Sequence, residues 1–380
     1  MKKVTILMCI FLGLHFAACN SKTAAGNGSD SSSAAGTQSA GCKEDAQEAA
    51  EIAGEKETSA EENRTDHLKQ TMNADMSAQQ DTVADLKDLK RHEDAVPVVY
   101  MTNEVSAEAL LHLYHFTGWE LAGEHTAVHI STGGRLAESG LEPELLYELV
   151  AYTDGTITIS NPAQSDFTMS DRQLKEAEEL GFTEVADVVV LDQDGVVLLP
   201  VEEGMRLAEN EVGSRFLEYD GILAVSHFQR HAAAGFSGAV QNISLGVSSS
   251  QGKCLICSAG SSRTDATVLQ QEAFMEAMAE AGKSVSDALN KNIYYINVMD
   301  HATIGCGCGT DSYGEDLHDI GILACEDPVA LDQACVDFIY TADANESFVE
   351  GLEAADAEYV LEYAEEVGLG NSAYTLVTID

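Results

Sequence analysis

Residues 221–264 read GILAVSHFQRHAAAGFSGAVQNISLGVSSSQGKCLICSAGSSRT. This stretch contains no Asp or Glu, although the whole chain carries 64 acidic residues among 380. Its ionisable side chains are basic or thiol groups, namely His227, Arg230, His231, Lys253, Cys254, Cys257 and Arg263. A segment without carboxylates favours a site for an anion or a thiolate-bound centre, because carboxylates nearby would repel both. The alternative is a buried glycine-rich segment, since burial also excludes carboxylates.

The charge of the remaining chain limits its partners. The formal net charge is −44, and 45 % of the residues are hydrophobic. The hydrophobic fraction is normal for a globular protein and provides for a sizeable core. Nucleic acid is excluded as an expected partner, because neutralising phosphates needs a basic face that so acidic a chain lacks.

The first 19 residues have the pattern of an export signal. Lys2 and Lys3 precede an apolar run, residues 4–16, and Ala17, Ala18 and Cys19 follow. This order is typical of a secretory signal, and the run is too short for an ordinary membrane span. A Cys after Phe-Ala-Ala resembles the bacterial lipobox, so residues 1–19 are predicted to be a lipoprotein signal peptide. Lipidation of Cys19 would anchor the chain to the extracytoplasmic face of the cell membrane; the alternative is a plain signal cut near Ala18.

Composition divides the rest into a tether and one folded domain. Residues 20–41 are mostly Ser, Ala, Gly, Asn and Thr, and residues 42–96 are acidic with few large apolar side chains. Neither segment offers enough apolar surface to fold, so residues 20–96 are predicted to be a disordered to partly helical tether. The domain is expected at residues 97–380.

Short apolar runs alternate with amphipathic segments through this domain. The pattern predicts strands at residues 98–101, 126–130, 156–160, 185–191, 196–200, 222–226, 293–299, 320–324 and 374–379. It predicts helices at residues 106–117, 142–152, 170–180, 238–245, 269–290 and 328–340, followed by two acidic helical segments. Asp194-Gly195 predicts a local β-hairpin, and Ser248–Ser250 a tight loop. The fold class is therefore α/β, with a mostly parallel sheet flanked by helices.

Several unusual residues follow predicted strands, where ligands gather in open α/β sheets. His227 follows one strand, with His231 four residues later, and a Gly-Cys-Gly-Cys-Gly segment at residues 305–309 follows another. Glycines on both sides allow the thiolates of Cys306 and Cys308 to turn toward one centre.

A soft-metal site usually needs four ligands, so other cysteines would have to join this pair. The candidates are Cys254 and Cys257, and Cys335 with Asp332 one helical turn before it. Cys254 and Cys257 could equally form a buried redox pair, and core packing is the alternative for Cys325 and Cys335. Lys253 lacks the surrounding spacing of a phosphate-binding P-loop.

Several longer runs resemble one family. They are Ser226-His227-Phe228, Gly238-Ala239 with Asn242-Ile243-Ser244, Gly252-Lys253-Cys254, Tyr295-Ile296-Asn297-Val298-Met299, and the closing segment from Asp319 to Asp337. Together they resemble the domain-of-unknown-function 362 family, whose members are described as uncharacterised iron-sulfur centre proteins. The resemblance implies cluster ligands at Cys254, Cys306, Cys308 and Cys335. Gln241 and His129 stand where the family usually has Lys, which argues against an anionic substrate site like that of relatives. Cys257 stands where the family has His, which implies an altered ligand set.

Three hypotheses about function follow. The first is an exported, lipid-anchored protein that binds an iron-sulfur cluster, expected to be 4Fe-4S, and exchanges electrons with a redox partner. The second is an extracytoplasmic binding lipoprotein that captures a small anion, with structural or zinc-bound cysteines. The third is a metal-dependent hydrolase or transferase near His227 and His231. The expected pocket residues are His227, His231, Asn242, Lys253 and Asp332.

Overall fold

The computed structural model describes residues 96–132, 136, 139–166, 168–300, 319–341 and 346–379. The predicted signal peptide with Cys19, the tether up to residue 95, and the Cys306 and Cys308 pair lie outside these residues. The predictions made for those segments remain predictions.

The centre of the fold is an eight-stranded sheet with the strand order β12-β1-β11-β10-β7-β2-β3-β4. The strands are β1 (Val98–Thr102), β2 (Thr126–Ile130), β3 (Thr156–Ile159), β4 (Val188–Val190), β7 (Gly221–His227), β10 (Ile293–Met299), β11 (Gly321–Cys325) and β12 (Thr375–Thr378). Only β11 runs antiparallel to its neighbours β1 and β10 in this sheet, and all other pairings are parallel. The α/β prediction is therefore confirmed.

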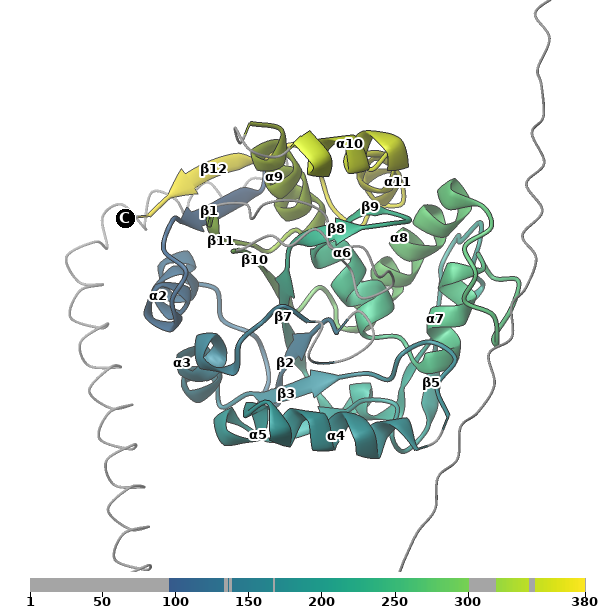
Figure 1. Ribbon diagram of the computed structural model, residues 1–380, viewed down its shortest axis with the longest axis horizontal. Coiled ribbons are helices and arrows are strands. Elements are labelled where there is room, and N and C mark those ends of the chain that lie inside the picture. Colours follow the sequence, from purple (N-terminus) through teal and green to yellow (C-terminus); the bar gives the residue numbers. More distant parts are fainter. Residues whose placement is uncertain are drawn as a thin grey trace, which may run out of the picture. The chain divides into compact units, whose positions relative to one another are not determined.

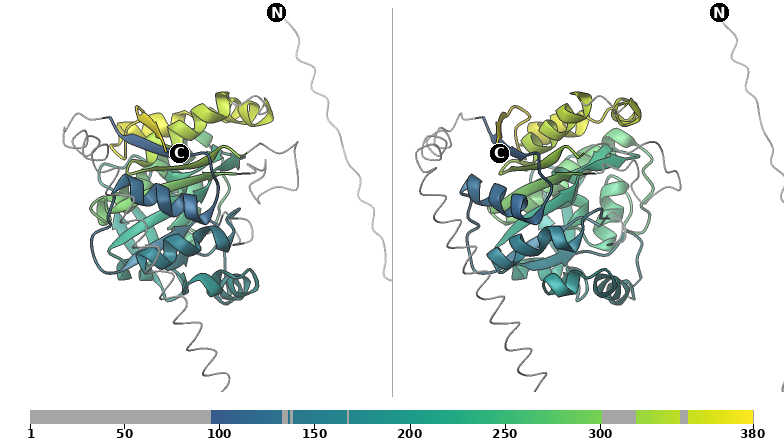
Figure 2. Two further views of the ribbon diagram at one scale, coloured as in Figure 1. Left: turned by 90° about the vertical axis from the view of Figure 1, so that its left-hand side faces the viewer. Right: turned by 60° about the vertical axis from the view of Figure 1, so that its left-hand side comes forward.

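Helices cover both faces of the sheet (Figures 1 and 2). One face packs against α2 (Ala107–Thr117), α3 (Pro143–Thr153), α4 (Met169–Glu179) and α5 (Phe182–Val185). The other packs against α6 (Ala239–Gln241), α7 (Ser250–Cys257), α8 (Gln271–Ala288), α9 (Pro328–Thr341), α10 (Glu346–Ala355) and α11 (Tyr359–Glu366). Strand β7 contributes to the hydrophobic core on each face of the sheet. Ile222 and Ala224 pack on the face covered by α6 to α11, and Leu223 and Val225 pack on the face covered by α2 to α5. This alternation is the period-two pattern of a strand buried on both faces.

Two predicted helix starts are confirmed by their caps. The Ser106 side chain accepts a hydrogen bond from the Ala109 amide at the start of α2. The Asp327 carboxylate accepts from the Val329 and Ala330 amides at the start of α9. Each cap satisfies backbone donors that the first helical turn leaves without partners.

The tight loop predicted at Ser248–Ser250 is confirmed for Ser248 and Ser249 but not for Ser250, which is the first residue of α7. Ser249 is the N-cap of α7, and its hydroxyl accepts a hydrogen bond of 3.0 Å from the Gly252 amide. Because this cap starts a helix that runs to Cys257, Lys253, Cys254 and Cys257 all lie on helix α7. A serine before a helical segment is a normal N-cap signal, which a run of three serines obscures.

The hairpin predicted at Asp194-Gly195 is also misplaced. Strand β4 pairs with β3 in the main sheet, and the chain then leaves that sheet through Gly195, whose φ is 134°. The local hairpins instead join β5 (Val196–Pro200) to β6 (Glu209–Gly213), and β8 (Gln229–His231) to β9 (Gly235–Ser237). Asp194-Gly195 therefore connects the main sheet to the β5–β6 hairpin. Strand β4 does not pair with β5, because it pairs in parallel with β3, the strand before it in the chain.

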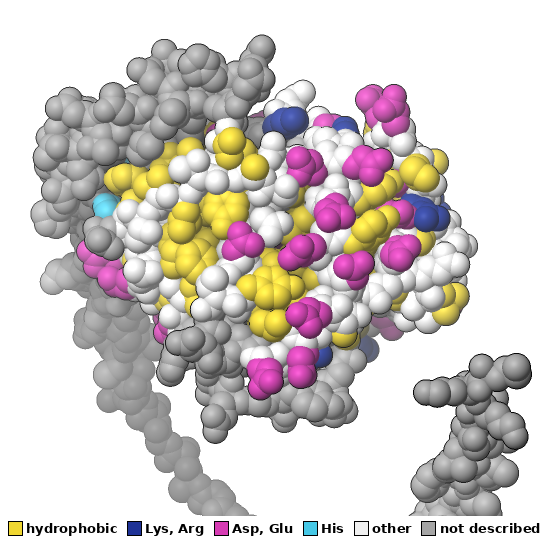
Figure 3. Space-filling view, turned by 90° about the horizontal axis from the view of Figure 1, so that it is seen from above, with side chains coloured by type: hydrophobic (Ala, Val, Ile, Leu, Met, Phe, Trp, Pro, Cys, Tyr) yellow, Lys and Arg dark blue, Asp and Glu magenta, His cyan; other side chains and the backbone are white. Residues whose placement is uncertain are grey.

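One face of the domain carries many of its acidic side chains. Figure 3 shows Asp and Glu side chains spread over the face seen from above, with few Lys or Arg among them. No helix in the described part of the chain is long and apolar enough to cross a membrane.

Candidate functional site

The strand order reverses between β2 and β7. From β2 the chain adds β3 and β4 on one side, and then returns to place β7 and β10 on the other. Strands β2 and β7 are parallel neighbours, so their carboxyl ends lie side by side. Such a switch point opens a crevice where ligands bind in open α/β sheets.

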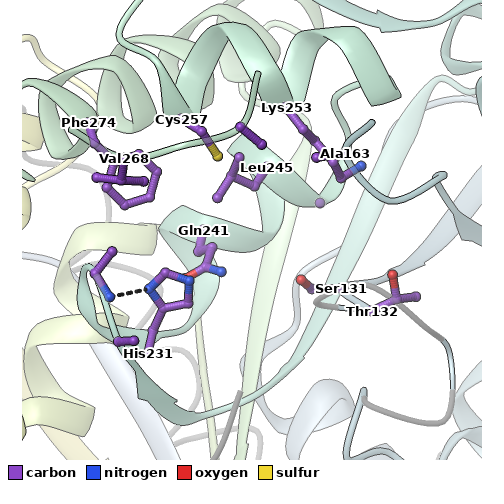
Figure 4. A pocket seen from close by; sticks show the side chains of 14 residues that line it. Ser131, Thr132, Ala163, His231, Gln241, Leu245, Lys253, Cys257, Val268 and Phe274 are labelled. Carbon is purple, nitrogen blue, oxygen red and sulfur yellow. Dashed lines mark hydrogen bonds between the residues drawn. The ribbon is translucent and has the colours of Figure 1, made fainter. Parts of the chain in front are cut away.

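A pocket of about 310 Å³ lies at this switch point. Its walls come from the segments that follow β2, β3 and β7, together with helices α6, α7 and α8 (Figure 4). The polar side chains that line it are Ser131, Thr132, His231, Gln241, Lys253 and Cys257, and the larger apolar ones are Leu245, Val268 and Phe274. The described lining holds one ammonium group and no carboxylate, so the acid-free segment contributes much of a pocket wall as expected.

Lys253 is the charged group of this pocket. Its Nζ donates hydrogen bonds of 2.6 Å to the Ser160 hydroxyl and 2.6 Å to the Ser248 carbonyl oxygen. Among the described residues it forms no salt bridge with a carboxylate. Burial lowers the pKa of Lys253 to about 8, although Asp192 opposes the shift. The ammonium form therefore predominates at neutral pH. The attraction of Asp192 offsets only part of the cost of burying its charge.

Ser160 and Ser248 hold the lysine in place. The Ser160 hydroxyl donates to the Gly246 carbonyl oxygen, so it can only accept from Lys253. Ser160 directly follows β3, and Ser248 lies just before α7. Neither serine was predicted from the sequence as a site residue. The available signal was a small polar residue at the carboxyl end of a strand, which also occurs at Ser131 after β2.

His231 and Gln241 face Lys253 across the pocket (Figure 4). The His231 Nδ1 accepts hydrogen bonds from the Ala233 and Ala234 amides, at 3.2 and 3.0 Å. Two donors at Nδ1 place the ring proton on Nε2 in the neutral imidazole. The Gln241 side chain is 6 % exposed, and its Oε1 has no hydrogen-bond partner among the described residues. The Gln241 amide oxygen can therefore accept a hydrogen bond from a ligand.

Asn242 lies under the pocket and does not line it. Its side-chain amide donates to the Val225 carbonyl oxygen at 3.0 Å and to the Ser226 hydroxyl at 2.9 Å. His129, beside it, is fully buried and contacts the Thr158 hydroxyl through Nδ1 at 3.0 Å. Burial and the Lys253 charge lower the pKa of His129 to about 3, so this imidazole is neutral. These residues support the pocket floor.

Asp332 was expected in the pocket, but its carboxylate lies in the core. It accepts hydrogen bonds from the Ala239 and Val240 amides at the start of α6, at 2.7 and 2.9 Å, and from Asn297 at 2.7 Å. Burial raises the pKa of Asp332 to about 6, and these hydrogen bonds oppose the shift. The carboxylate anchors α6, the helix that carries Gln241, to α9 and β10.

His227 is likewise outside this pocket. Its Nε2 lies 2.8 Å from the Asp300 carbonyl oxygen and 3.0 Å from the Asp300 carboxylate. Burial alone would lower the pKa of His227, but the hydrogen bonds to Asp300 outweigh it and raise the pKa. Gly140 packs directly on the other ring nitrogen, where an added Cβ would lie 2.3 Å from Nδ1. His227 and His231 therefore face different surroundings.

The cysteines of the predicted cluster are not gathered among the described residues. Cys254 is buried on α7 and Cys335 on α9, and Figure 1 shows these helices well apart. The Cys335 thiol accepts a hydrogen bond from Asn297, and Cys325 is a buried core residue at the end of β11. Of the cysteines that the structure describes, Cys257 is the one that turns its sulfur toward the pocket, and burial raises the pKa of this thiol to about 11.

A metal centre would need more donors than the described residues bring together. In the ranges that the structure describes, no group of three or more His, Cys, Asp or Glu side chains is arranged to hold a metal ion. Cys254, Cys257 and Cys335 thus do not form a ligand set by themselves, and His227 with His231 does not either. Cys306 and Cys308 lie outside the described residues.

Comparison with known families identifies the chain. Residues 127–337 match the family described as Domain of unknown function (DUF362), which is more than half of the sequence. The chain belongs to this family. The DUF362 segment runs from β2 into α9 and includes every residue that lines the pocket, and it confirms the resemblance seen in the sequence.

Two solved structures resemble the DUF362 chain in part. The lactate racemase apoprotein from Thermoanaerobacterium thermosaccharolyticum is 15 % identical, with 63 % of this chain and 56 % of that one covered and a TM-score of 0.38. A structural-genomics protein from Thermotoga maritima is 14 % identical, with 68 % and 58 % covered and a TM-score of 0.33. The chain thus spans little more than half the length of either protein, and likeness at this level carries no information on activity. No curated protein matches the sequence.

Proposed function

We propose that this protein binds a small organic anion in the switch-point pocket, as an extracytoplasmic lipoprotein anchored through Cys19. The observation that supports the proposal most is the Lys253 ammonium, which reaches a pocket whose described lining contains no carboxylate. The carboxylate of Asp192 attracts this partly buried ammonium but forms no salt bridge with it among the described residues, so an anionic ligand in the pocket would add a direct ion pair. The extracytoplasmic setting rests on the signal pattern of residues 1–19.

The pocket also limits the size and character of the ligand. A volume of about 310 Å³ is at the small end of the range for ligand pockets. Leu245, Val268 and Phe274 would contact hydrocarbon, while Lys253 and Gln241 would contact polar atoms. A short carboxylate with an apolar side chain fits this division better than a sugar phosphate or a peptide does.

Ligand-induced stabilisation tests the proposal. The melting temperature of the full chain is measured with short carboxylates, from acetate to phenylacetate, and with their neutral amides. We expect at least one carboxylate to raise the melting temperature with concentration while its amide does not, because only the anion pairs with Lys253. Equal shifts with the acid and its amide, or no shift with any acid, would refute the proposal.

A matched pair of variants assigns the effect to the pocket. Lys253→Met removes the ammonium but retains an unbranched apolar side chain, and it should abolish the shift. Lys175→Met removes an exposed charge on α4, which forms a salt bridge with Glu179, and it should leave the shift unchanged. Loss of the shift in both variants would point to the overall charge of the protein instead of the pocket.

An iron-sulfur protein with a redox role is the second candidate, and the Cys257 sulfur at the pocket wall favours it. Such a cluster would need Cys306 and Cys308 as further thiolate donors. Purification of the full chain without oxygen, followed by assays for iron, sulfide and zinc, tests this candidate. Iron and sulfide in comparable amounts would support it. Zinc without sulfide would indicate a structural or hydrolytic metal site, and protein without metal would exclude both.

A further inference from the structure

The hydrogen bonds around Lys253 fix the direction in which its nitrogen meets a ligand. Nζ has four tetrahedral positions, of which Cε fills one. The Ser160 hydroxyl and the Ser248 carbonyl oxygen, each 2.6 Å away, take two more. Ser160 cannot reverse its role, because its own proton is donated to the Gly246 carbonyl oxygen. One position of Nζ is therefore left for a group in the pocket.

That remaining position holds an N–H in the ammonium form and the lone pair in the neutral amine. Two anchored N–H bonds thus orient the lone pair, which is the geometry required of a nucleophilic amine. A lysine that only paired with an anion would not need this orientation, since an ammonium is a point charge with rotating donors. The arrangement therefore serves attack on an electrophilic carbon as well as charge pairing.

We propose that Lys253 forms an imine with the carbonyl carbon of a small 2-oxo carboxylate bound in the pocket. This inference rests on the proposed function and names the ligand class of the same site. Among the described lining residues Lys253 is the one Lys or Arg, so the carbonyl carbon and the carboxylate must both lie next to Nζ. In a 2-oxo acid the two groups are directly bonded and meet that requirement. The apolar side chains of Leu245, Val268 and Phe274 leave room for the hydrocarbon substituent.

The step is balanced without an oxidant or a second reactant. The Nζ lone pair forms the new C–N bond, and the carbonyl C–O bond breaks. Counted from the ammonium form, two of the three nitrogen protons leave with the carbonyl oxygen as water. The third stays on the iminium nitrogen, where it can still donate to the Ser248 carbonyl oxygen. The positive iminium beside the ligand carboxylate retains the charge pair that binding creates.

Reductive trapping of pyruvate tests the proposal. The full chain is incubated with pyruvate at constant pH, with and without cyanoborohydride, and the intact mass and the peptide map are measured. We expect one reduced adduct per chain, located on Lys253, which forms only with the reductant. Propionate, which lacks the carbonyl group, should bind but give no adduct. Adducts spread over several lysines, or none on Lys253 while pyruvate binds, would overturn the proposal.

Two variants separate chemistry from fold. Lys253→Met should lose the adduct while Lys175→Met retains it. Ala266→Trp places a bulky side chain at a partly exposed position of the pocket wall and should reduce trapping at least tenfold while the protein remains folded. Full trapping in Ala266→Trp would place the reactive lysine outside the pocket. If neither pyruvate nor propionate binds, the proposed function itself fails; binding without trapping removes only the imine.

Discussion

The affinity of the pocket for an anion should depend on pH in a way that reports Lys253. Burial lowers the pKa of this ammonium from 10.5 to about 8, so its charge is present below that value and is lost above it. If only the ammonium form binds the carboxylate, affinity is constant from about pH 6 to 7. It then falls about tenfold for each pH unit well above 8. A surface lysine of ordinary pKa would instead produce this fall only above about pH 10.

The assay is isothermal titration of propionate or pyruvate into the full chain at several pH values between about 6 and 10. In Lys253→Met the affinity at pH 7 should drop by a factor of about 10 to 100, since a charge-assisted hydrogen bond contributes about 1.5–3 kcal/mol. The pH dependence should disappear along with it. Constant affinity of the unmodified protein up to pH 10, or an unchanged break near pH 8 in Lys253→Met, would refute the reasoning.

Three further predictions concern the support of the pocket and the membrane anchor. Asp332→Ala leaves backbone donors of α6 buried without an acceptor and should lower the free energy of unfolding by about 3 kcal/mol in urea titrations, whereas a change below about 0.5 kcal/mol would contradict the anchoring role. Gly140→Ala should destabilise the protein more than Gly368→Ala does in thermal unfolding. Both glycines have positive φ, 72° and 78°, but an added Cβ contacts His227 only at Gly140, so equal effects would be evidence against that packing. Cys19→Ala should move the protein from the membrane to the soluble fraction, and retention in the membrane would refute lipidation.

Much of the fold could be predicted because its strands are short apolar runs between amphipathic helices. The bounds of β2 and β10 agree with the sequence pattern at every residue. The failures occurred where local signals compete with tertiary pairing. Asp194-Gly195 has hairpin chemistry, yet the strand before it pairs with β3, a choice that depends on contacts distant in sequence. Likewise the serine run before α7 hid an N-cap among residues typical of loops.

The candidate site was predicted in part for a related reason. Absence of carboxylates is a property of a continuous segment, so the sequence pointed to the acid-free wall with His231, Lys253 and Cys257. Hydrogen-bond partners from other segments leave no such trace, and Ser160, 93 residues before Lys253, went unnoticed. The same limit applies to Asp332, whose burial against α6 is visible only once the helices are packed.

A crystal structure of the full chain grown with pyruvate tests the central claim most directly. We predict ligand density in the switch-point pocket, with the carboxylate next to the Lys253 Nζ and with Gln241 within hydrogen-bonding distance. Density elsewhere on the protein, or a bound ligand whose carboxylate does not contact Lys253, would contradict it.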